Sequence, residues 1–244
     1  MIHYYVLASG SKGNSCLIQS GDTTILIDCG TTRRYLFSKL SELQIDIQSL
    51  SALLITHDHS DHISQIKYFN DLPIYAPCMI SKVNQVHRVI PYQSFMIHHV
   101  KITPIELSHD TEIIVGYIID DGQEKLVYIT DTGYIKQADI QYCQSAHHII
   151  IESNYDIELL MQSNRPYTTK MRIMSDSGHL SNELCGHYLS CIATHQTKSV
   201  TLAHLSQEAN EEVLALQVAQ SYLDKTTFQG ILQVAKQFEV VKYD

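Results

Sequence analysis

The sequence predicts an α/β (α+β) protein in which two packed β-sheets are flanked by helices. Apolar, β-branched runs dominate both halves of the chain, and segments with helical apolar spacing follow only some of these runs. This pattern favours two sheets that pack face to face with the helices outside. No linker, repeat or block of like charges interrupts the chain, so we expect a single domain over residues 1–244.

In the first half, short apolar runs separated by turn residues predict strands. These runs cover residues 3–9, 15–20, 23–30, 52–56 and 73–77. The break at Gly21-Asp22 is compatible with a tight hairpin. Apolar residues recur at helical spacing over residues 33–43, which predicts a helix, and a second helix is expected from about Ser64.

The second half begins with β-branched segments and then alternates strands with helices. Strands are predicted over residues 94–107, 111–119, 125–131, 147–153 and 199–205. The carboxyl end, residues 231–243, is predicted as strand, with a helix tail as the alternative.

Composition limits the classes of function. A chain of 244 residues is long enough to bury a sizeable core. No apolar run approaches the roughly 18 residues of a membrane span, and the first residues lack a basic leader, so we expect a cytoplasmic protein without a membrane partner. The scattered cysteines favour reduced, mostly buried thiols. The net charge of −9 excludes a surface that is basic throughout, although a local basic strip remains compatible with it.

The motif "THDHSDH" directly follows the buried strand predicted at 52–56. In an extended turn, alternate side chains point the same way, so His57 and His59 can bind one ion. Asp61 and His62, at the entry to a helix, can then face a second ion. Imidazole and carboxylate ligands suit Zn²⁺, Mn²⁺ or Fe. The alternative is an accidental cluster in a histidine-rich chain, and the position at a strand end disfavours it.

Three later positions supply further candidate ligands. His109 lies in a turn between two β-rich runs, Asp131 ends a strand and has a carboxylate that can bridge two cations, and His204 ends an apolar strand. Each of these residues alone is more often structural. Together with the first cluster they indicate a site for two divalent metal ions.

The order of these residues resembles the metallo-β-lactamase fold family: H-x-H-x-D-H, then a single histidine, then "TDTG", then a last histidine. The resemblance also includes "VLASGSKGNS", "LIDCG", "SHD", "ESNYD", "GHLSNE" and "AHLS", and it covers most of the chain. It is greatest to the YycJ (WalJ) branch, which groups with cytoplasmic bacterial phosphodiesterases and nucleases. The resemblance implies an αββα sandwich of two mixed sheets with a dinuclear metal site.

The resemblance also implies a role for individual residues. One ion would be held by His57, His59 and His109, the other by Asp61, His62 and His204, with Asp131 bridging the two. Asp28 of "LIDCG" would orient the histidine loop.

This chain departs from the branch at two points. It has Tyr155 where the branch usually has histidine, and it lacks a tryptophan common in that region. A base would then lose its stacking partner, unless Tyr167 replaces the tryptophan.

The predicted activity is hydrolysis of phosphodiester bonds. Two adjacent cations lower the pKa of a bridging water and give hydroxide near neutral pH. Asp61 would orient or deprotonate this nucleophile. A leaving alkoxide needs a proton, and His179 is the candidate donor, because related phosphodiesterases of the fold place a histidine there. The alternative is that His179 is a helix-start residue beside the capping signal Ser181-x-Glu183.

Candidate substrate contacts come from two segments. Asn14 and the amides of "GSKGN" are placed to bind a phosphate or the metal loop, and a plain hairpin turn is the alternative. Lys170 and Arg172 are candidates to follow a phosphate backbone, or else are ordinary solvated side chains.

The expected substrate is nucleic acid, DNA rather than RNA, and the resemblance suggests a 5′-to-3′ exonuclease. Hydrolysis of a small cyclic phosphodiester, a thioester or a lactone is the alternative, because one fold hosts all of these activities. A non-enzymatic regulator is disfavoured, because every ligand position is filled.

Overall fold

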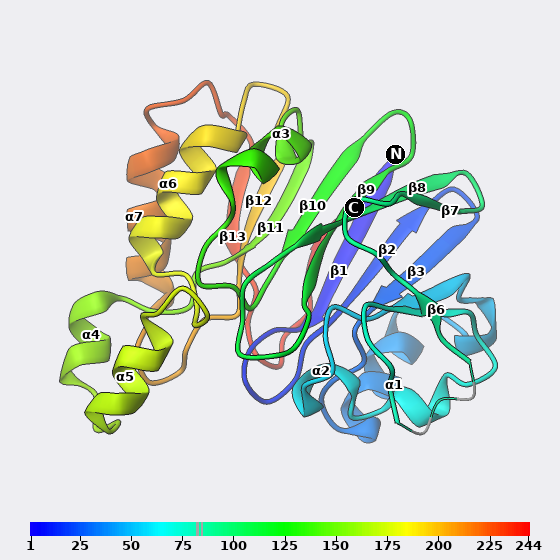
Figure 1. The fold of residues 1–244 in the computed structure, drawn as a ribbon. Helices are drawn as coiled ribbons and strands as arrows, with labels where there is room; N and C mark the ends of the chain where they lie inside the picture. Colours follow the sequence, from blue (N-terminus) through cyan, green and yellow to red (C-terminus); the bar gives the residue numbers. More distant parts are fainter. Residues whose placement is uncertain (82, 84) are drawn as a thin grey trace.

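The computed structural model describes residues 1–81, 83 and 85–244. Its described strands form two seven-stranded sheets that lie face to face, with helices on the outer faces (Figure 1). This arrangement confirms the fold class expected from the sequence. No helix in the described part of the chain is long and apolar enough to cross a membrane.

The first sheet is mixed. Its spatial order is β14 (Val241–Tyr243), β1 (Ile2–Ala8), β2 (Ser15–Ser20), β3 (Thr23–Ile27), β4 (Ala52–Leu54), β5 (Ile74–Ala76) and β6 (His87–Arg88). Strands β14 to β3 pair antiparallel, and β3 to β6 pair parallel.

The second sheet repeats this organisation. Its order is β13 (Ile231–Val234), β12 (Ser199–Ala203), β11 (His148–Glu152), β10 (Lys125–Ile129), β9 (Val115–Asp120), β8 (Val100–Glu106) and β7 (Phe95–Ile97). Strands β13 to β10 are parallel, and β10 to β7 are antiparallel.

The core has three layers because side chains alternate along each strand. In β3, Ile25 and Ile27 belong to the cluster between the sheets, while Leu26 belongs to the cluster beneath α1. In β11, Ile150 faces the other sheet, while Ile149 packs toward α6. Both faces of each sheet are therefore apolar, and each outer face needs helices to cover it.

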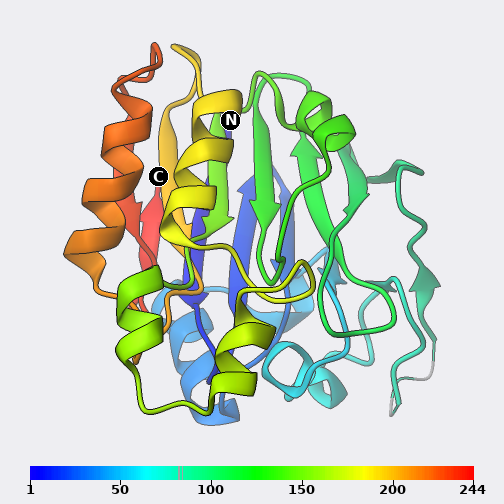
Figure 2. The same ribbon diagram turned by 60° about the vertical axis from the view of Figure 1, so that its left-hand side comes forward.

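The helices cover the two outer faces. On the first sheet lie α1 (Arg33–Glu42) and the short α2 (Ser60–Ile63); on the second lie α3 (Ile140–Cys143), α6 (Asn182–Ile192) and α7 (Glu212–Leu223). The short helices α4 (Ile157–Gln162) and α5 (Tyr167–Ile173) sit together at the end of this layer (Figure 2). Single 3₁₀ turns occur at Ile47–Ser49, Ile66–Tyr68 and Gln137–Asp139.

Three sequence predictions need correction. The helix expected from about Ser64 instead begins at Ser60, because the amides of His62 and Ile63 bond to the carbonyl of His59. The run 94–107 is a hairpin, since His98 adopts a left-handed φ of 51° between β7 and β8. The run 231–243 divides into β13 and β14, which join different sheets.

The cysteines agree with the sequence prediction. All six are free, and four of them are buried: Cys16, Cys29, Cys143 and Cys185.

Candidate metal centre

The candidate ligands gather where parallel strands end. Strands β3 and β4 of the first sheet and β10, β11 and β12 of the second all run toward the same edge, and the chain places a histidine or a carboxylate at or just after each end. These residues are Asp28, His57, Asp131, Glu152 and His204. Carboxyl ends of parallel strands form the crevice in which open α/β sheets bind ligands.

Three of these residues have an unusual backbone. Asp28, Asp131 and His204 have φ angles of 57°, 57° and 56°, in the left-handed region that residues with a Cβ seldom adopt. Such conformations persist where surrounding contacts enforce them, and they cluster at functional sites.

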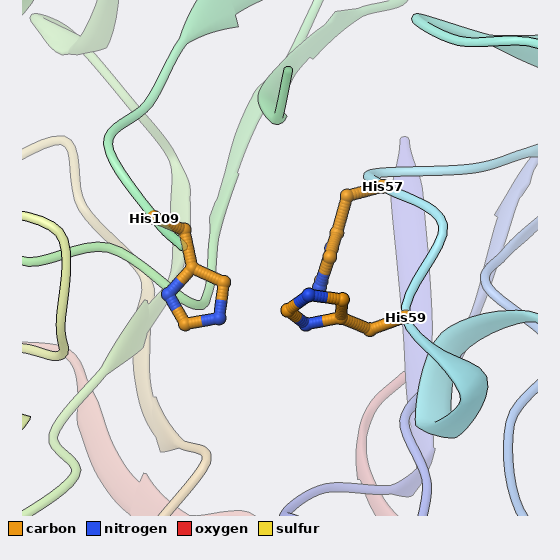
Figure 3. Close-up of side chains that lie close together, drawn as sticks. All are labelled: His57, His59 and His109. Atoms are coloured by element: carbon orange, nitrogen blue, oxygen red, sulfur yellow. The ribbon is translucent and has the colours of Figure 1, made fainter. Parts of the chain in front are cut away.

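The first ligand set consists of His57, His59 and His109. Figure 3 shows their rings converging, with His109 reaching across from a different segment of the chain. One ring nitrogen from each lies within 4.8 Å of the others. His109 Nδ1 donates to the carbonyl of Gly178 at 3.0 Å, so Nε2, which lies 3.0 Å from Asp110 Oδ1, is the nitrogen that would bind a cation. The buried Nε2 of His57 has no hydrogen-bond partner in the described chain.

The second set joins His57 to His62 and Asp131, with ligand atoms again within 4.8 Å. His62 Nε2 lies 3.1 Å from Asp131 Oδ2. On the other side of the ring, His62 Nδ1 donates to Asp28 Oδ2 at 2.8 Å. The Asp28 carboxylate also accepts from the amide and the hydroxyl of Thr56, both at 2.9 Å, and so fixes the ring of His62.

The third set contains Asp131, Glu152, His179 and His204. One oxygen of Glu152, Oε1, accepts from Nδ1 of His179 and from Nδ1 of His204, both at 2.7 Å. The buried Nε2 of His204 then has no partner among the described residues and is free to bind a cation. The other oxygen of Glu152 accepts from the amide of Thr132 at 2.9 Å.

Glu152 was missed by the sequence reasoning, although a signal existed. It ends a buried strand, just as Asp131 follows one, and it is the first residue of "ESNYD". Tyr155 of this segment is buried in a small cluster with Leu160 and Ile173, and burial raises its pKa to about 12.

Charge and burial set the protonation of the centre. Burial lowers the pKa of His57 far below its ordinary range. For His62, burial is outweighed by Asp28 and Asp131, which hold its pKa well above the ordinary range. For His204, burial lowers the pKa, but Asp131 and Glu152 outweigh it and raise the pKa to about 9.

Two carboxyl groups of the centre, those of Asp131 and Glu152, have pKa values held below their usual range. Burial alone would raise the pKa of Asp131, but His204 and His62 hold it well below the usual range. The pKa of Glu152 is lowered in the same way, since His179 and His204 outweigh its burial. A divalent cation would therefore meet negative carboxylates and would replace protons on the imidazoles.

Asp61 and Asn14 border the centre. Asp61 Oδ2 lies 3.6 Å from His62 Nε2, but none of the ligand sets found among the described residues includes it. Asn14 is buried, and its amide nitrogen lies 3.3 Å from Asp61 Oδ2 and 2.9 Å from His62 Nε2. Of its two expected roles, this placement favours contact with the metal loop over contact with a phosphate.

A glycine holds this loop in place. A Cβ atom at Gly30 would lie 1.8 Å from the carbonyl oxygen of Asp61, so only glycine fits there. The same carbonyl accepts from the amide of Asn14 at 2.8 Å.

The remaining predicted residues have different surroundings. Lys170 is buried and donates to the carbonyl of Met161 at 2.6 Å, which argues against a phosphate contact. Arg172 is exposed and pairs with Asp110. Tyr167 is also exposed. His179 lies outside helix α6, whose cap is the hydroxyl of Ser181.

The residues present fit divalent metal ions. All the donors are imidazole nitrogens or carboxylate oxygens, which suit Zn²⁺, Mn²⁺ or Fe. Two of the nitrogens, Nε2 of His57 and of His204, are buried without a partner in the described chain, and such orphaned atoms are rare unless a ligand satisfies them. Cations bound at the ligand sets of these two residues would satisfy both.

Comparison with known proteins agrees with this picture. A family model described as a beta-lactamase superfamily domain matches residues 23–205. The chain is 30% identical over 242 residues to exodeoxyribonuclease YycJ of Bacillus anthracis, an alignment that covers 93% of this chain and 91% of that protein. It is 33% identical over 229 residues to exodeoxyribonuclease WalJ of Streptococcus pneumoniae, covering 87% and 84%.

Solved structures show the same fold. The metallo-β-lactamase fold protein YhfI from Bacillus subtilis aligns with a TM-score of 0.74 at 20% identity, over 99% of both chains. The short form of human tRNase Z aligns with a TM-score of 0.68 at 14% identity, over 98% of both chains. The chain therefore belongs to the β-lactamase superfamily, as a metal-dependent hydrolase with the metallo-β-lactamase fold.

Proposed function

We propose that this protein is a dinuclear phosphodiesterase that hydrolyses nucleic acid, with DNA as its first candidate substrate. The observation that carries the proposal is that adjoining ligand sets have members in common: His57 belongs to the first and second sets, and Asp131 to the second and third. Ligand sets that share residues support the proposal of two ions side by side. A pair of divalent cations supplies a nucleophile at neutral pH and neutralises phosphate oxygens.

The ligands divide between the two ions. His57, His59 and His109 would hold one, and Asp61, His62 and His204 the other, with Asp131 touching both. Asp61 is partly exposed at the edge of the centre, where its carboxylate can orient the attacking group. Asp28 and Glu152 keep two of the imidazoles in the tautomer that presents Nε2.

His179 would supply the proton for the leaving oxygen. Its Nδ1 donates to Glu152, so when the ring is doubly protonated the proton on the other nitrogen, Nε2, is the one that can be transferred. That proton passes to the alkoxide as the P–O bond breaks. A thiolate leaves without such help, so the Glu152–His179 pair favours phosphodiesters over thioesters.

DNA is favoured by the relatives. Two proteins named exodeoxyribonuclease are 30% and 33% identical over most of the chain. We propose exonucleolytic cleavage in the 5′-to-3′ direction, as the branch resemblance suggests.

The test uses purified protein reconstituted with Mn²⁺ or Zn²⁺. End-labelled single- and double-stranded DNA, RNA, bis(p-nitrophenyl) phosphate and a thioester are offered in parallel. We expect two ions per chain and stepwise shortening of DNA from its 5′ end. His57→Ala should lose bound metal and all DNA cleavage. Preferred hydrolysis of the thioester, or full activity with His57→Ala, would contradict the proposal.

A further inference from the structure

An ion pair borders the three-histidine set. Asp110 Oδ1 lies 3.0 Å from His109 Nε2 and 3.9 Å from His59 Nε2. The other carboxylate oxygen of Asp110 accepts from Arg172 Nη1. The guanidinium therefore lies one carboxylate group away from the nitrogens that would hold an ion. It remains accessible, since 62% of the Arg172 side chain is exposed.

The backbone that carries Arg172 is closely held. The amide of Ser175 bonds to the carbonyl of Arg172 at 3.1 Å, and the amide of His179 bonds to the carbonyl of Ile173 at 2.9 Å. A Cβ atom at Gly178 would lie 2.4 Å from the carbonyl oxygen of Arg172, so the turn closes only around glycine. One tight turn thus carries Arg172, the carbonyl that orients His109, and His179.

This turn is also packed against the loop after β10, which contains Asp131. A Cβ atom at Gly133 would lie 2.2 Å from the carbonyl oxygen of Asp176. Arg172 is therefore attached to a segment whose position relative to the metal centre is set by backbone contacts on both sides.

We propose that Arg172 binds the phosphate next to the one being cleaved, and that Asp110 holds the guanidinium at the rim until that phosphate arrives. The inference rests on the proposed function. It identifies the residue that would favour a polynucleotide over a small substrate with one phosphate. An exposed Arg–Asp pair is worth only about 0–1 kcal/mol, so a phosphate can exchange with the carboxylate. Guanidinium binds phosphate through paired, charge-assisted hydrogen bonds.

The distance from the centre decides which phosphate is bound. Because the Asp110 carboxylate separates Arg172 from the histidine nitrogens, the guanidinium is displaced outward from the cleaved group. A small substrate with one phosphate does not extend to it, whereas a polynucleotide does.

Arg165 offers a matched control. It lies just before α5, and its Nε donates to Glu208 at 2.9 Å, so it is another arginine of this region paired with a carboxylate. None of the ligand sets in the described chain includes Arg165 or its partner.

The experiment compares Arg172→Ala, Arg172→Lys and Arg165→Ala. With metal-loaded protein, Arg172→Ala should raise KM for an oligonucleotide about tenfold with little change in kcat, the size expected for one charge-assisted contact. The loss on bis(p-nitrophenyl) phosphate should be at least about fivefold smaller. Arg172→Lys should recover part of the affinity, and Arg165→Ala should match the parent protein.

A second readout does not involve turnover. The affinity of metal-free protein for a fluorescein-labelled single strand, measured by anisotropy at several salt concentrations, should fall for Arg172→Ala. Its salt slope should become shallower by about 0.7, because one phosphate contact is lost on a single strand.

Two results separate the inference from the proposed function. If the parent protein cleaves oligonucleotides and Arg172→Ala retains its KM and its salt slope, the inference is wrong and the function stands. If the parent protein hydrolyses bis(p-nitrophenyl) phosphate but neither binds nor cleaves any nucleic acid, the proposed function fails, and the inference fails with it.

Discussion

Glu152 orients both a candidate metal ligand, His204, and the candidate general acid, His179. A single buried oxygen accepts from both His179 and His204. Removing its charge would disturb two rings at once. Removing the imidazole of His179 would disturb only proton donation, provided that the ring is not a ligand.

This difference predicts a dependence on the leaving group. His179→Ala should slow cleavage of DNA by roughly 10²–10⁴-fold, the usual range for general acid–base catalysis, because a sugar alkoxide needs a proton. Bis(p-nitrophenyl) phosphate should lose far less, since nitrophenolate leaves unaided, and metal content should stay at two ions.

Glu152→Gln provides the comparison. It should lower both activities and reduce metal content, because His204 loses its orienting carboxylate. An equal loss on both substrates with His179→Ala, together with a lower melting temperature, would assign His179 a structural role. Loss of one ion in that variant would make it a ligand.

At the scale of elements, loops between strands and helices position the ligands more than the helices do. Helix α2 begins inside the histidine motif, so His57 and His59 precede it and His62 lies within it. The loop after β3 packs directly on this motif: the amide of Cys29 bonds to the carbonyl of His62 at 2.7 Å. Close backbone approach, rather than side-chain packing, holds the two loops together.

Gly30→Ala tests this contact. The added methyl group would collide with the Asp61 carbonyl, so the loops must separate. We expect the free energy of unfolding to fall by about 2–3 kcal/mol and metal affinity to weaken. Urea denaturation and metal titration measure the two effects.

Gly122→Ala is the matched control. Gly122 has a φ of 85°, but an added methyl group would meet no atom of the described chain within 4 Å beyond its immediate neighbours. Its substitution should cost only about 1 kcal/mol, from the left-handed backbone, and leave metal affinity unchanged. If both variants lost the same stability and metal affinity, the close approach at Gly30 would not be the contact that holds the loop of His57 to His62 in place.

At the scale of the whole molecule, a buried polar network connects the two sheets at the end away from the metal centre. The hydroxyl of Tyr4 in β1 lies 2.7 Å from Thr201 and 2.9 Å from Ser199, both in β12. Ser199 also lies 2.9 Å from Nδ1 of the buried His148. Glu124 accepts from the amide of Ile2 in the first sheet and lies 3.5 Å from His148 Nε2.

This network predicts acid sensitivity. Burial lowers the pKa of His148 to about 4, and the attraction of Glu124 only partly offsets it. The unfolded chain, with an ordinary histidine pKa of about 6.5, binds more protons than the folded chain between these values. Stability is therefore lost as the pH falls from about 6.5 to about 4, by up to about 3 kcal/mol.

The measurement is urea unfolding at several pH values with metal-free protein, so that release of metal does not contribute. His148→Gln keeps a group that can bond to Ser199 but does not titrate. It should show a shallower loss of stability in this pH window than the parent protein. Parallel pH profiles for the two proteins would show that His148 does not control the effect.

The sequence by itself determined the layered fold and the order of the candidate ligands. Short continuous apolar runs, as in β3 and β11, are local information, and so is the spacing of His57, His59 and His62 in one loop. The fold class and the family expected from these patterns are confirmed, and the ligand roles stay predictions.

Only the tertiary structure decided the contacts between distant segments. The sequence pattern could not show that β13 and β14 join different sheets, because an apolar run does not specify which strand it pairs with. Nor could it show that Glu152 accepts hydrogen bonds from two histidines, that Lys170 is buried, or that Arg172 forms an ion pair with Asp110. These relations depend on where separate loops come together in space, and that position is set by the packing of both sheets rather than by neighbours along the chain.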